Sequence, residues 1–237
     1  MTTYRIERVS DKKELAQKAS TFVASEIKMV LDQKERFQLA LSGGSTPSDT
    51  YKLLGCEQLQ WNRVDIFLGD ERWVDIQDPA SNAGMINRTL LSSNIAIDSK
   101  FYPVPTVQFS NARQSAVAYS HLLEKVCNGK PPEFDLILLG LGDDGHTASL
   151  FPWSKSLMNK DSWVTDANAN GHDRISFTSS VLSSAKKVIF LVNGSSKQIA
   201  LQRLLDTTES SDRTPARLVQ PNSEILIIAD DAALELI

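Results

Sequence analysis

Residues 134–152 have the sequence FDLILLGLGDDGHTASLFP. The first half is a nearly unbroken apolar run, typical of a strand that is covered on both faces, as the strands of a parallel sheet are. The second half is a loop of glycines that also carries two aspartates and a histidine. Because ligands of open α/β sheets bind beyond the carboxyl ends of the strands, this unit favours an α/β fold with a functional site at the loop.

The same strand-and-loop unit recurs along the chain. Amphipathic stretches predict helices over residues 11–31, 47–54, 112–127 and 195–205. Strands that alternate with helices form a mostly parallel sheet with helices on both faces. We therefore expect residues 1–237 to form a single doubly wound α/β domain. Its strands are predicted at FQLAL (37–41), VDIFL (64–68), FDLILLGL (134–141), KVIFLV (187–192) and EILIIA (224–229), with a further strand-like stretch from about Tyr4.

Charge and hydropathy exclude several classes of partner. The net charge of −4 comes without a long run of either sign, whereas a nucleic-acid-binding protein needs a basic face. No apolar run reaches the roughly 18 residues of a membrane span, and the N-terminal sequence lacks the apolar core of a signal peptide. Two cysteines, Cys56 and Cys127, have no metal-like neighbours and are expected to be reduced thiols. We therefore expect a cytoplasmic protein that binds neither nucleic acid nor membrane.

The loop after the strand at 37–41 has the sequence SGGSTP and is predicted to bind an anion. Its glycines let the backbone approach a ligand closely, and hydroxyl groups flank them. Pro47 suits the first position of the next helix, with Thr46 as its cap and Asp49 as a capping-box partner. The plainer alternative is an ordinary turn between strand and helix. The predicted anion-binding residues are Ser42, Gly43, Gly44, Ser45 and Thr46.

Two further cations lie next to apolar stretches: Lys197 follows one, and Arg174 precedes another. Lys197, in NGSSKQ, falls in the first turn of a predicted helix, where a cation opposes the helix dipole unless a bound phosphate offsets it. Arg174, in GHDRISFT, could add a second positive charge. The alternative for Lys197 is a side chain that extends into solvent.

The strand at 64–68 is followed by GDERWV, which places Arg72 next to Asp70 and Glu71. One interpretation is a local ion pair at the edge of the sheet. The other is a guanidinium that is held by carboxylates and directed at substrate oxygens. In all, four strand ends carry glycine, hydroxyl and charged residues together, which is a stronger signal than any one motif.

The glycines of residues 140–145 fit G-x-G-x-x-G, the pattern of a dinucleotide-binding turn. That turn should open a long helix, but Pro152 follows only seven residues after the last glycine. Asp143 and Asp144 would also repel a pyrophosphate. We therefore interpret the match as accidental.

His146 follows the same loop glycines, two residues after Asp144. An imidazole at a strand's carboxyl end, with a carboxylate nearby to orient it, is typical of a general base. His121, within a predicted helix, and His172, in a predicted loop, lack such surroundings and are expected at the surface. No His/Cys cluster has the spacing of metal ligands, so neither a metal nor a cofactor is expected.

The motifs together resemble those of 6-phosphogluconolactonases, in the glucosamine/galactosamine-6-phosphate isomerase superfamily. The resemblance covers about residues 5–234, and the motifs occur in the family's order and spacing. It implies hydrolysis of 6-phospho-D-glucono-1,5-lactone to 6-phospho-D-gluconate, the second step of the oxidative pentose phosphate pathway, by general-base activation of water. The motifs are LALSGGSTP, FLGDERWV with SNAGM downstream, LLGLGDDGHTASLFP, NGSSK and TPARLV.

The resemblance also implies a role for individual residues. His146 would be the base, and Arg72 would line the lactone end of the site. Asp144 is a further candidate catalytic residue from its position near His146, although the sequence leaves open which carboxylate orients the imidazole. The SGGSTP loop, Lys197 and Arg174 would bind the substrate phosphate. We further expect Asp70 and Gly142 to contact the substrate. The only partner expected is this sugar-phosphate lactone, and the protein is expected to be a monomer.

Two other functions remain open at this point. A glucosamine-6-phosphate deaminase would be similar in fold and phosphate loop, but it resembles D-G-H-I-A-F-N-E-P in the histidine loop and carries a glutamate where this chain has Phe151. A non-catalytic sugar-phosphate sensor would carry a helix-turn-helix ahead of the domain. Here the first strand-like stretch begins near Tyr4, which leaves no room for one.

Overall fold

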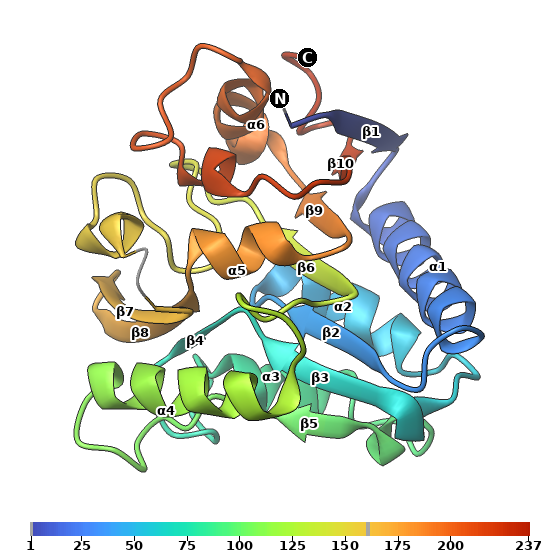
Figure 1. Cartoon of the computed structure of the whole chain (residues 1–237). Coiled ribbons are helices and arrows are strands. Elements are labelled where there is room, and N and C mark those ends of the chain that lie inside the picture. The colour runs from blue at the N-terminus through green and yellow to red at the C-terminus, as the bar shows by residue number, and fades with distance from the viewer. Residues whose placement is uncertain (1, 160–161) are drawn as a thin grey trace.

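The computed structural model describes residues 2–159 and 162–237. Its main sheet has seven strands, all parallel, in the order β1-β10-β9-β6-β2-β3-β5 (Figure 1). The five predicted apolar runs and the stretch near Tyr4 all form strands of this sheet, which confirms the α/β prediction. The strands are β1 (Tyr4–Val9), β2 (Phe37–Leu41), β3 (Val64–Leu68), β5 (Lys100–Tyr102), β6 (Leu136–Gly140), β9 (Val188–Val192) and β10 (Ile225–Asp230).

Helices cover both faces of the sheet. Figure 1 shows α5 crossing in front of β6 and α2 lying behind it. The four predicted helices form, with shifts of a few residues at their ends, whereas the short helices α3 and α5 were not predicted from the sequence. The helices are α1 (Lys12–Leu31), α2 (Ser45–Leu54), α3 (Asn82–Arg88), α4 (Ala112–Val126), α5 (Ser179–Ser184) and α6 (Gln198–Leu205).

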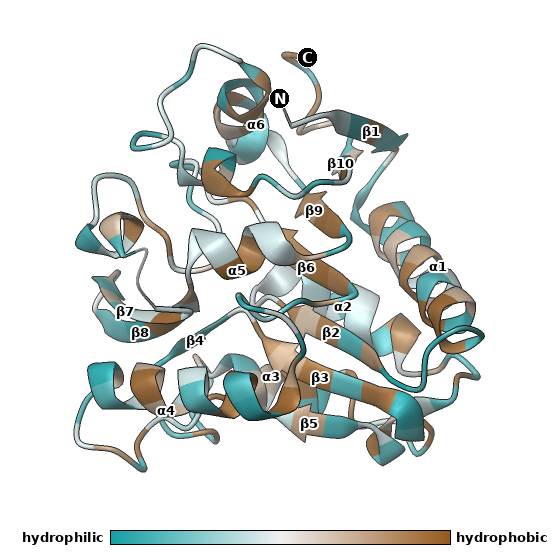
Figure 2. Ribbon diagram, viewed as in Figure 1, coloured by the Kyte–Doolittle hydropathy of each residue, from teal (hydrophilic) through white to brown (hydrophobic). Residues whose placement is uncertain are grey.

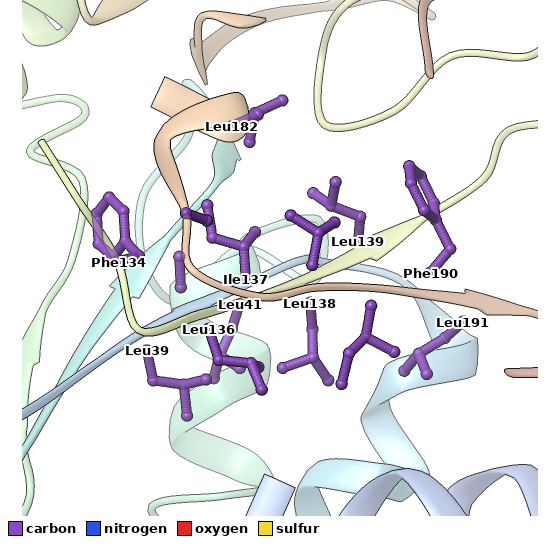
Figure 3. Packing of buried hydrophobic residues seen from close by; sticks show 14 of the residues in the cluster. Leu39, Leu41, Phe134, Leu136, Ile137, Leu138, Leu139, Leu182, Phe190 and Leu191 are labelled. Carbon is purple, nitrogen blue, oxygen red and sulfur yellow. The ribbon is translucent and has the colours of Figure 1, made fainter. Parts of the chain in front are cut away.

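Burial of the central strands explains why their sequences are apolar throughout. Side chains alternate between the two faces of a strand, so a strand covered on both faces needs apolar residues at every position. Figure 3 shows this at β6, where Ile137 and Leu139 lie on the side of Leu182, and Leu136 and Leu138 lie on the opposite side. Figure 2 shows the same contrast across the molecule, with hydrophobic strands inside and mixed helices around them. In the described part of the chain, no helix is both long and apolar enough to cross a membrane.

A second, three-stranded antiparallel sheet was not predicted from the sequence. It consists of β4 (Asp70–Arg72), β8 (His172–Phe177) and β7 (Val164–Ala169). His172 therefore begins a strand, and its predicted position in a loop is wrong. The β4–β8 ladder places Arg72 directly opposite Arg174. The small sheet thus brings together two arginines that are about 100 residues apart in the sequence.

The site lies where four neighbouring strands of the main sheet end. Strands β9, β6, β2 and β3 are adjacent and parallel, so their carboxyl ends lie along one edge. The loops that follow them are therefore brought together, although they are spread over residues 42–197 of the sequence.

Candidate active site

A cavity of about 430 Å³ opens at this carboxyl edge of the main sheet. It is bounded by the SGGSTP loop (residues 42–47), the histidine loop (residues 140–152), the NGSSK loop (residues 193–197) and the small sheet. The structure brings nearly all the predicted site residues to this cavity, and Asp144 lies just behind its wall. The predicted residues that line it are Ser42, Gly43, Gly44, Ser45, Thr46, Asp70, Arg72, Gly142, His146, Arg174 and Lys197.

The SGGSTP loop turns directly into helix α2. The helix begins at Ser45 after Gly44, whose φ of 109° lies in the region that favours glycine. The predicted cap by Thr46 and Asp49 is therefore wrong, because Thr46 is already inside the helix and no described side chain caps its N-terminus. Asp49 instead pairs with Lys12. The first N–H groups of α2, which have no intrahelical acceptor, lie beside the cavity, as an anion-binding site requires.

Asn82, which belongs to the SNAGM motif but was assigned no role from the sequence, packs against this loop. A Cβ atom on Gly43 would lie 1.9 Å from Asn82 Oδ1, so only glycine fits there. The buried Asn82 amide donates to the backbone oxygen of Asp70 at 2.9 Å and to its Oδ1 at 3.2 Å. Ser149 Oγ donates to Asp70 Oδ2 at 2.6 Å. Asp70 therefore lines the cavity while its carboxylate joins α3 to the histidine loop.

Arg72 is not held by the neighbouring carboxylates, so that part of the prediction is wrong. Its Nη1 donates to the backbone oxygen of Ala80 at 2.7 Å. Glu71 accepts backbone N–H groups from Arg72, Asn82 and Ala83 at 2.7–2.8 Å. Burial raises the pKa of Glu71, and these hydrogen bonds oppose the rise. Arg72 Nε is buried and has no hydrogen-bond partner among the described residues, which leaves a donor beside the cavity.

Arg174 lies opposite Arg72 and is only 6% exposed. Its Nη1 is 4.0 Å from Asp70 Oδ2, and its Nε donates to the backbone oxygen of Ala169 at 3.2 Å. Burial lowers the pKa of Arg174, the charge of Arg72 lowers it further, and nearby carboxylates raise it. Two guanidiniums side by side are unfavourable unless an anion is close. This wall of the cavity is therefore suited to a negatively charged ligand.

His146 is oriented by Asp144, which answers the question that the sequence left open. Asp144 Oδ1 lies 2.6 Å from His146 Nδ1 and also accepts the backbone N–H of His146 at 3.0 Å. Burial alone would raise the pKa of Asp144, but these hydrogen bonds outweigh it and hold the pKa below its ordinary value. The carboxylate therefore stays ionised and accepts a proton held on Nδ1. A neutral imidazole in this arrangement carries its lone pair on Nε2.

The imidazole is packed tightly in place. A Cβ atom on Gly142 would lie 2.0 Å from His146 Nδ1, and the Gly142 N–H donates to the backbone oxygen of His146 at 2.8 Å. The ring also packs on Phe151, at 4.4 Å between ring centroids, and the Arg174 guanidinium lies 5.3 Å from the centre of the Phe151 ring. The glycine and the phenylalanine together restrict the motion of the ring.

The loop after Gly145 turns back on itself instead of opening a helix. Thr147 bridges to Leu150, and the next helical turn begins only at Lys155. This confirms that the match to the dinucleotide pattern is accidental. The described residues contain no group of three or more His, Cys, Asp or Glu that could hold a metal ion.

Lys197 reaches the cavity from the NGSSK loop. It lies in the 3₁₀ turn η4 (Ser195–Lys197), and α6 begins only at the next residue, Gln198. The prediction that Lys197 falls in the first turn of the helix is therefore wrong by one residue. Its ammonium forms an ion pair with Asp143 of the histidine loop, and Ser196 Oγ donates to the same carboxylate at 3.2 Å. The two loops are therefore joined at the rim of the cavity. His121, by contrast, lies on α4 with its side chain 68% exposed, as expected.

Comparisons with known proteins agree with this geometry. The family model described as glucosamine-6-phosphate isomerases/6-phosphogluconolactonase matches residues 10–228. The chain is 36% identical to a 6-phosphogluconolactonase of Synechocystis sp., over 98% of this chain and 97% of that protein. A second 6-phosphogluconolactonase, from Nostoc sp., is 35% identical over 96% of each chain.

Solved structures show the same relationship. A 6-phosphogluconolactonase from Shewanella baltica superposes with a TM-score of 0.87 at 28% identity, over 97% of this chain and 98% of that one. The enzyme from Trypanosoma brucei gives a TM-score of 0.88 at 26% identity, over 99% of both chains. We conclude that the chain belongs to the family of glucosamine-6-phosphate isomerases and 6-phosphogluconolactonases.

Proposed function

We propose that this protein hydrolyses 6-phospho-D-glucono-1,5-lactone to 6-phospho-D-gluconate, the second step of the oxidative pentose phosphate pathway. Its curated relatives at 35–36% identity are named 6-phosphogluconolactonases and match it over nearly their full length. The observation that carries the proposal is the His146–Asp144 pair, whose imidazole borders a cavity that Arg72 and Arg174 also line. In this proposal residues 1–237 act as a single domain.

His146 acts as a general base. Its Nε2 removes a proton from a water molecule as the water oxygen attacks the lactone carbonyl. Asp144 keeps the proton on Nδ1 and stabilises the imidazolium that forms. The oxyanion of the tetrahedral intermediate is stabilised by Arg72 or by N–H groups of the glycine-rich histidine loop. When the intermediate collapses, the ring C–O bond breaks and the ring oxygen takes the proton from His146, which restores the neutral base.

The substrate phosphate binds at the SGGSTP loop with Lys197 and Arg174. The uncapped N-terminus of α2 supplies N–H donors, and Ser42 Oγ is buried without a partner among the described residues. Lys197 is already paired with Asp143, so the phosphate exchanges with a carboxylate instead of meeting a free ammonium. A phosphate carries more charge and more acceptor oxygens than a carboxylate, which favours this exchange.

Phe151 argues against a deaminase. Ring opening and isomerisation of an amino sugar need a carboxylate at this position, and here a phenyl ring packs on His146. We further propose that the protein acts as a cytoplasmic monomer without a nucleic-acid partner, since its net charge is −4 and the cavity is formed within one chain.

The direct test is a coupled assay with freshly generated lactone. The 6-phosphogluconate that forms is oxidised by an added dehydrogenase, and the NADPH produced is measured. The rate of spontaneous lactone hydrolysis is subtracted. We expect hydrolysis well above the spontaneous rate and no release of ammonia from glucosamine 6-phosphate. Ammonia release without lactone hydrolysis would overturn the proposal in favour of deamination.

A further inference from the structure

The main sheet splits between β2 and β6 at its carboxyl edge. These two strands pair only at Leu39–Leu136 and Ala40–Ile137. Strand β2 continues its pairing with β3 for one more residue, and β6 continues with β9 for three more. The SGGSTP loop leaves from one side of this split and the histidine loop from the other, so the split opens into the cavity.

The split leaves the backbone of Ser42 without a strand partner. Leu41 accepts the N–H of Gly69 on the β3 side, and successive residues of a strand direct their polar groups to opposite neighbours. The N–H and C=O of Ser42 therefore face the side from which β6 has turned away. Buried backbone groups without partners are costly, so something must replace the missing strand.

The Tyr51 hydroxyl fills this place. It accepts the N–H of Ser42 at 3.1 Å and donates to the backbone oxygen of Ser42 at 2.9 Å. Tyr51 lies on α2 with 0% exposure, and it does not line the cavity. Burial raises the pKa of its phenol, which keeps the hydroxyl a donor. One side chain thus satisfies both backbone groups of the residue that begins the SGGSTP loop.

We propose that Tyr51 is a positioning residue for phosphate binding, an inference that rests on the proposed function of the SGGSTP loop. Its hydroxyl holds Ser42, and through it the glycines that precede α2, in the arrangement that receives a phosphate. Tyr51 belongs to α2, so it also ties this helix to the end of β2. The hydroxyl acts through the loop and makes no contact with the substrate.

Tyr119 provides a matched control at the neighbouring strand end. It lies on α4 at 1% exposure, and its hydroxyl accepts the N–H of Leu68 at 3.0 Å and contacts the backbone oxygens of Leu68 and Tyr102 at 3.3 and 3.2 Å. The chemistry and burial are the same as at Tyr51. The strand end that Tyr119 supports leads through Gly69 into β4, which carries Asp70 and Arg72, and not into the SGGSTP loop. The comparison between the two variants therefore rests on the Kd for phosphate, which depends on the SGGSTP loop.

The test compares Tyr51→Phe with Tyr119→Phe in the full-length protein. The measurements are the Kd for inorganic phosphate, kcat and KM for the phosphorylated lactone, and the melting temperature. For Tyr51→Phe we expect the Kd for phosphate and the KM to rise by about tenfold, equivalent to about 1.4 kcal/mol, with kcat nearly unchanged. Tyr119→Phe should lower the melting temperature similarly and leave the Kd for phosphate within about twofold, because the two variants lose hydrogen bonds of the same kind.

Several outcomes would overturn the inference. A Tyr51→Phe variant with the wild-type Kd and KM would make Tyr51 merely structural, and an equal rise in both variants would indicate a general loosening of the sheet. Hydrogen exchange in the wild type decides the matter even if Tyr51→Phe does not fold: the Ser42 amide should be as protected as that of Leu41, and exchange at a loop rate would overturn the inference. A wild type that binds phosphate but leaves the lactone intact would refute the proposed function alone, and one that binds no phosphate would refute both.

Discussion

Buried carboxylates at the amino edge of the main sheet are paired directly with cations, whereas the two arginines of the small sheet, beside the carboxyl edge, have no such close partner. At the amino edge, the buried carboxylates Asp135 and Asp65 each meet a cation directly: Lys34 Nζ is 2.8 Å from both oxygens of Asp135, and Arg36 donates to both oxygens of Asp65 at 2.6 and 2.8 Å. At the carboxyl edge, Arg72 and Arg174 lie opposite each other. Their shortest ion-pair contact with a described residue is 4.0 Å.

The difference separates charges that stabilise the fold from charges that can act on a ligand. A buried carboxylate that is paired with a cation has no free acceptor for a ligand. Removal of its partner leaves a buried charge uncompensated and lowers the free energy of unfolding. Two adjacent arginines, one with a buried Nε that lacks a partner among the described residues, keep unused positive potential and donors. Changes at the amino edge should therefore lower the free energy of unfolding and leave kcat and KM nearly unchanged. Changes at the carboxyl edge should impair kcat or KM and leave the free energy of unfolding nearly unchanged.

The largest expected effect is at His146. The variant His146→Gln removes the base, and kcat should fall by about 10²–10⁴-fold, the range for a positioned base. KM and the melting temperature should change little, because the side chain borders the cavity and is 27% exposed. A folded His146→Gln enzyme with near-wild-type kcat would remove His146 as the base and leave Asp144 as the next candidate.

At the amino edge, Asp135→Asn should act on stability alone. Asp135 accepts hydrogen bonds from Lys34, Lys186 and the backbone N–H of Gln38, and the amide weakens all three. We expect a loss of about 2–4 kcal/mol in the free energy of unfolding, towards the lower end of the cost of breaking a buried pair, because the lysines can turn to solvent. Urea unfolding and kcat are the two measurements. A large drop in kcat with unchanged stability would contradict the division between the two edges.

Lys197→Ala should mainly weaken substrate binding. Loss of a charge-assisted contact with the phosphate should raise KM by an amount equivalent to about 1.5–3 kcal/mol. Lys34→Ala is the matched control at the amino edge and should leave KM unchanged. Unphosphorylated gluconolactone should be a poor substrate of the wild type. Equal turnover of the two lactones would show that the phosphate is not recognised.

The smallest expected effect is that of a chelator. The His146–Asp144 pair supplies the base directly, and a lactone carbonyl is electrophilic enough to react with water activated in this way. Activity should therefore survive exhaustive treatment with EDTA. Loss of activity that one specific ion restores would show instead that the acidic residues of the histidine loop form a metal site.

Most of the main sheet could be predicted from the sequence because burial on both faces leaves a local signal. The exception is its edge strand β5, which has three residues, none of them fully buried, and was not predicted. Runs such as VDIFL and KVIFLV are apolar throughout, and each forms a strand within a residue or so of its predicted bounds. The small sheet leaves no such signal. Its strand β4 has three residues, all charged, and it pairs with a strand 100 residues away. Short elements stabilised by distant partners carry little periodicity of their own.

The candidate site was predictable to the extent that its residues follow strands of the main sheet. Asn82 belongs to the SNAGM motif, but no role could be predicted for it because its relation to Gly43 is purely spatial. The predicted carboxylate partners of Arg72 were wrong for two reasons. Neighbouring residues of a strand face opposite sides, so Glu71 points away from the Arg72 side chain. The Asp70 carboxylate accepts hydrogen bonds from Asn82 and Ser149 instead. The predicted cap at Thr46 failed because Gly44 adopts a positive φ and lets α2 begin at Ser45.

The central claim is that a neutral imidazole at the carboxyl edge activates water for attack on the lactone. The measurement that tests it most directly is the pH dependence of kcat/KM for the phosphorylated lactone, corrected at each pH for spontaneous hydrolysis. The pKa of Asp144 is held below its ordinary value, so this carboxylate stays ionised and continues to orient the imidazole during the measurement. A general base acts only in its unprotonated form, so kcat/KM should fall as the pH is lowered and should rise with pH through a single ionisation. A flat profile, or the same rise in His146→Gln, would contradict the claim.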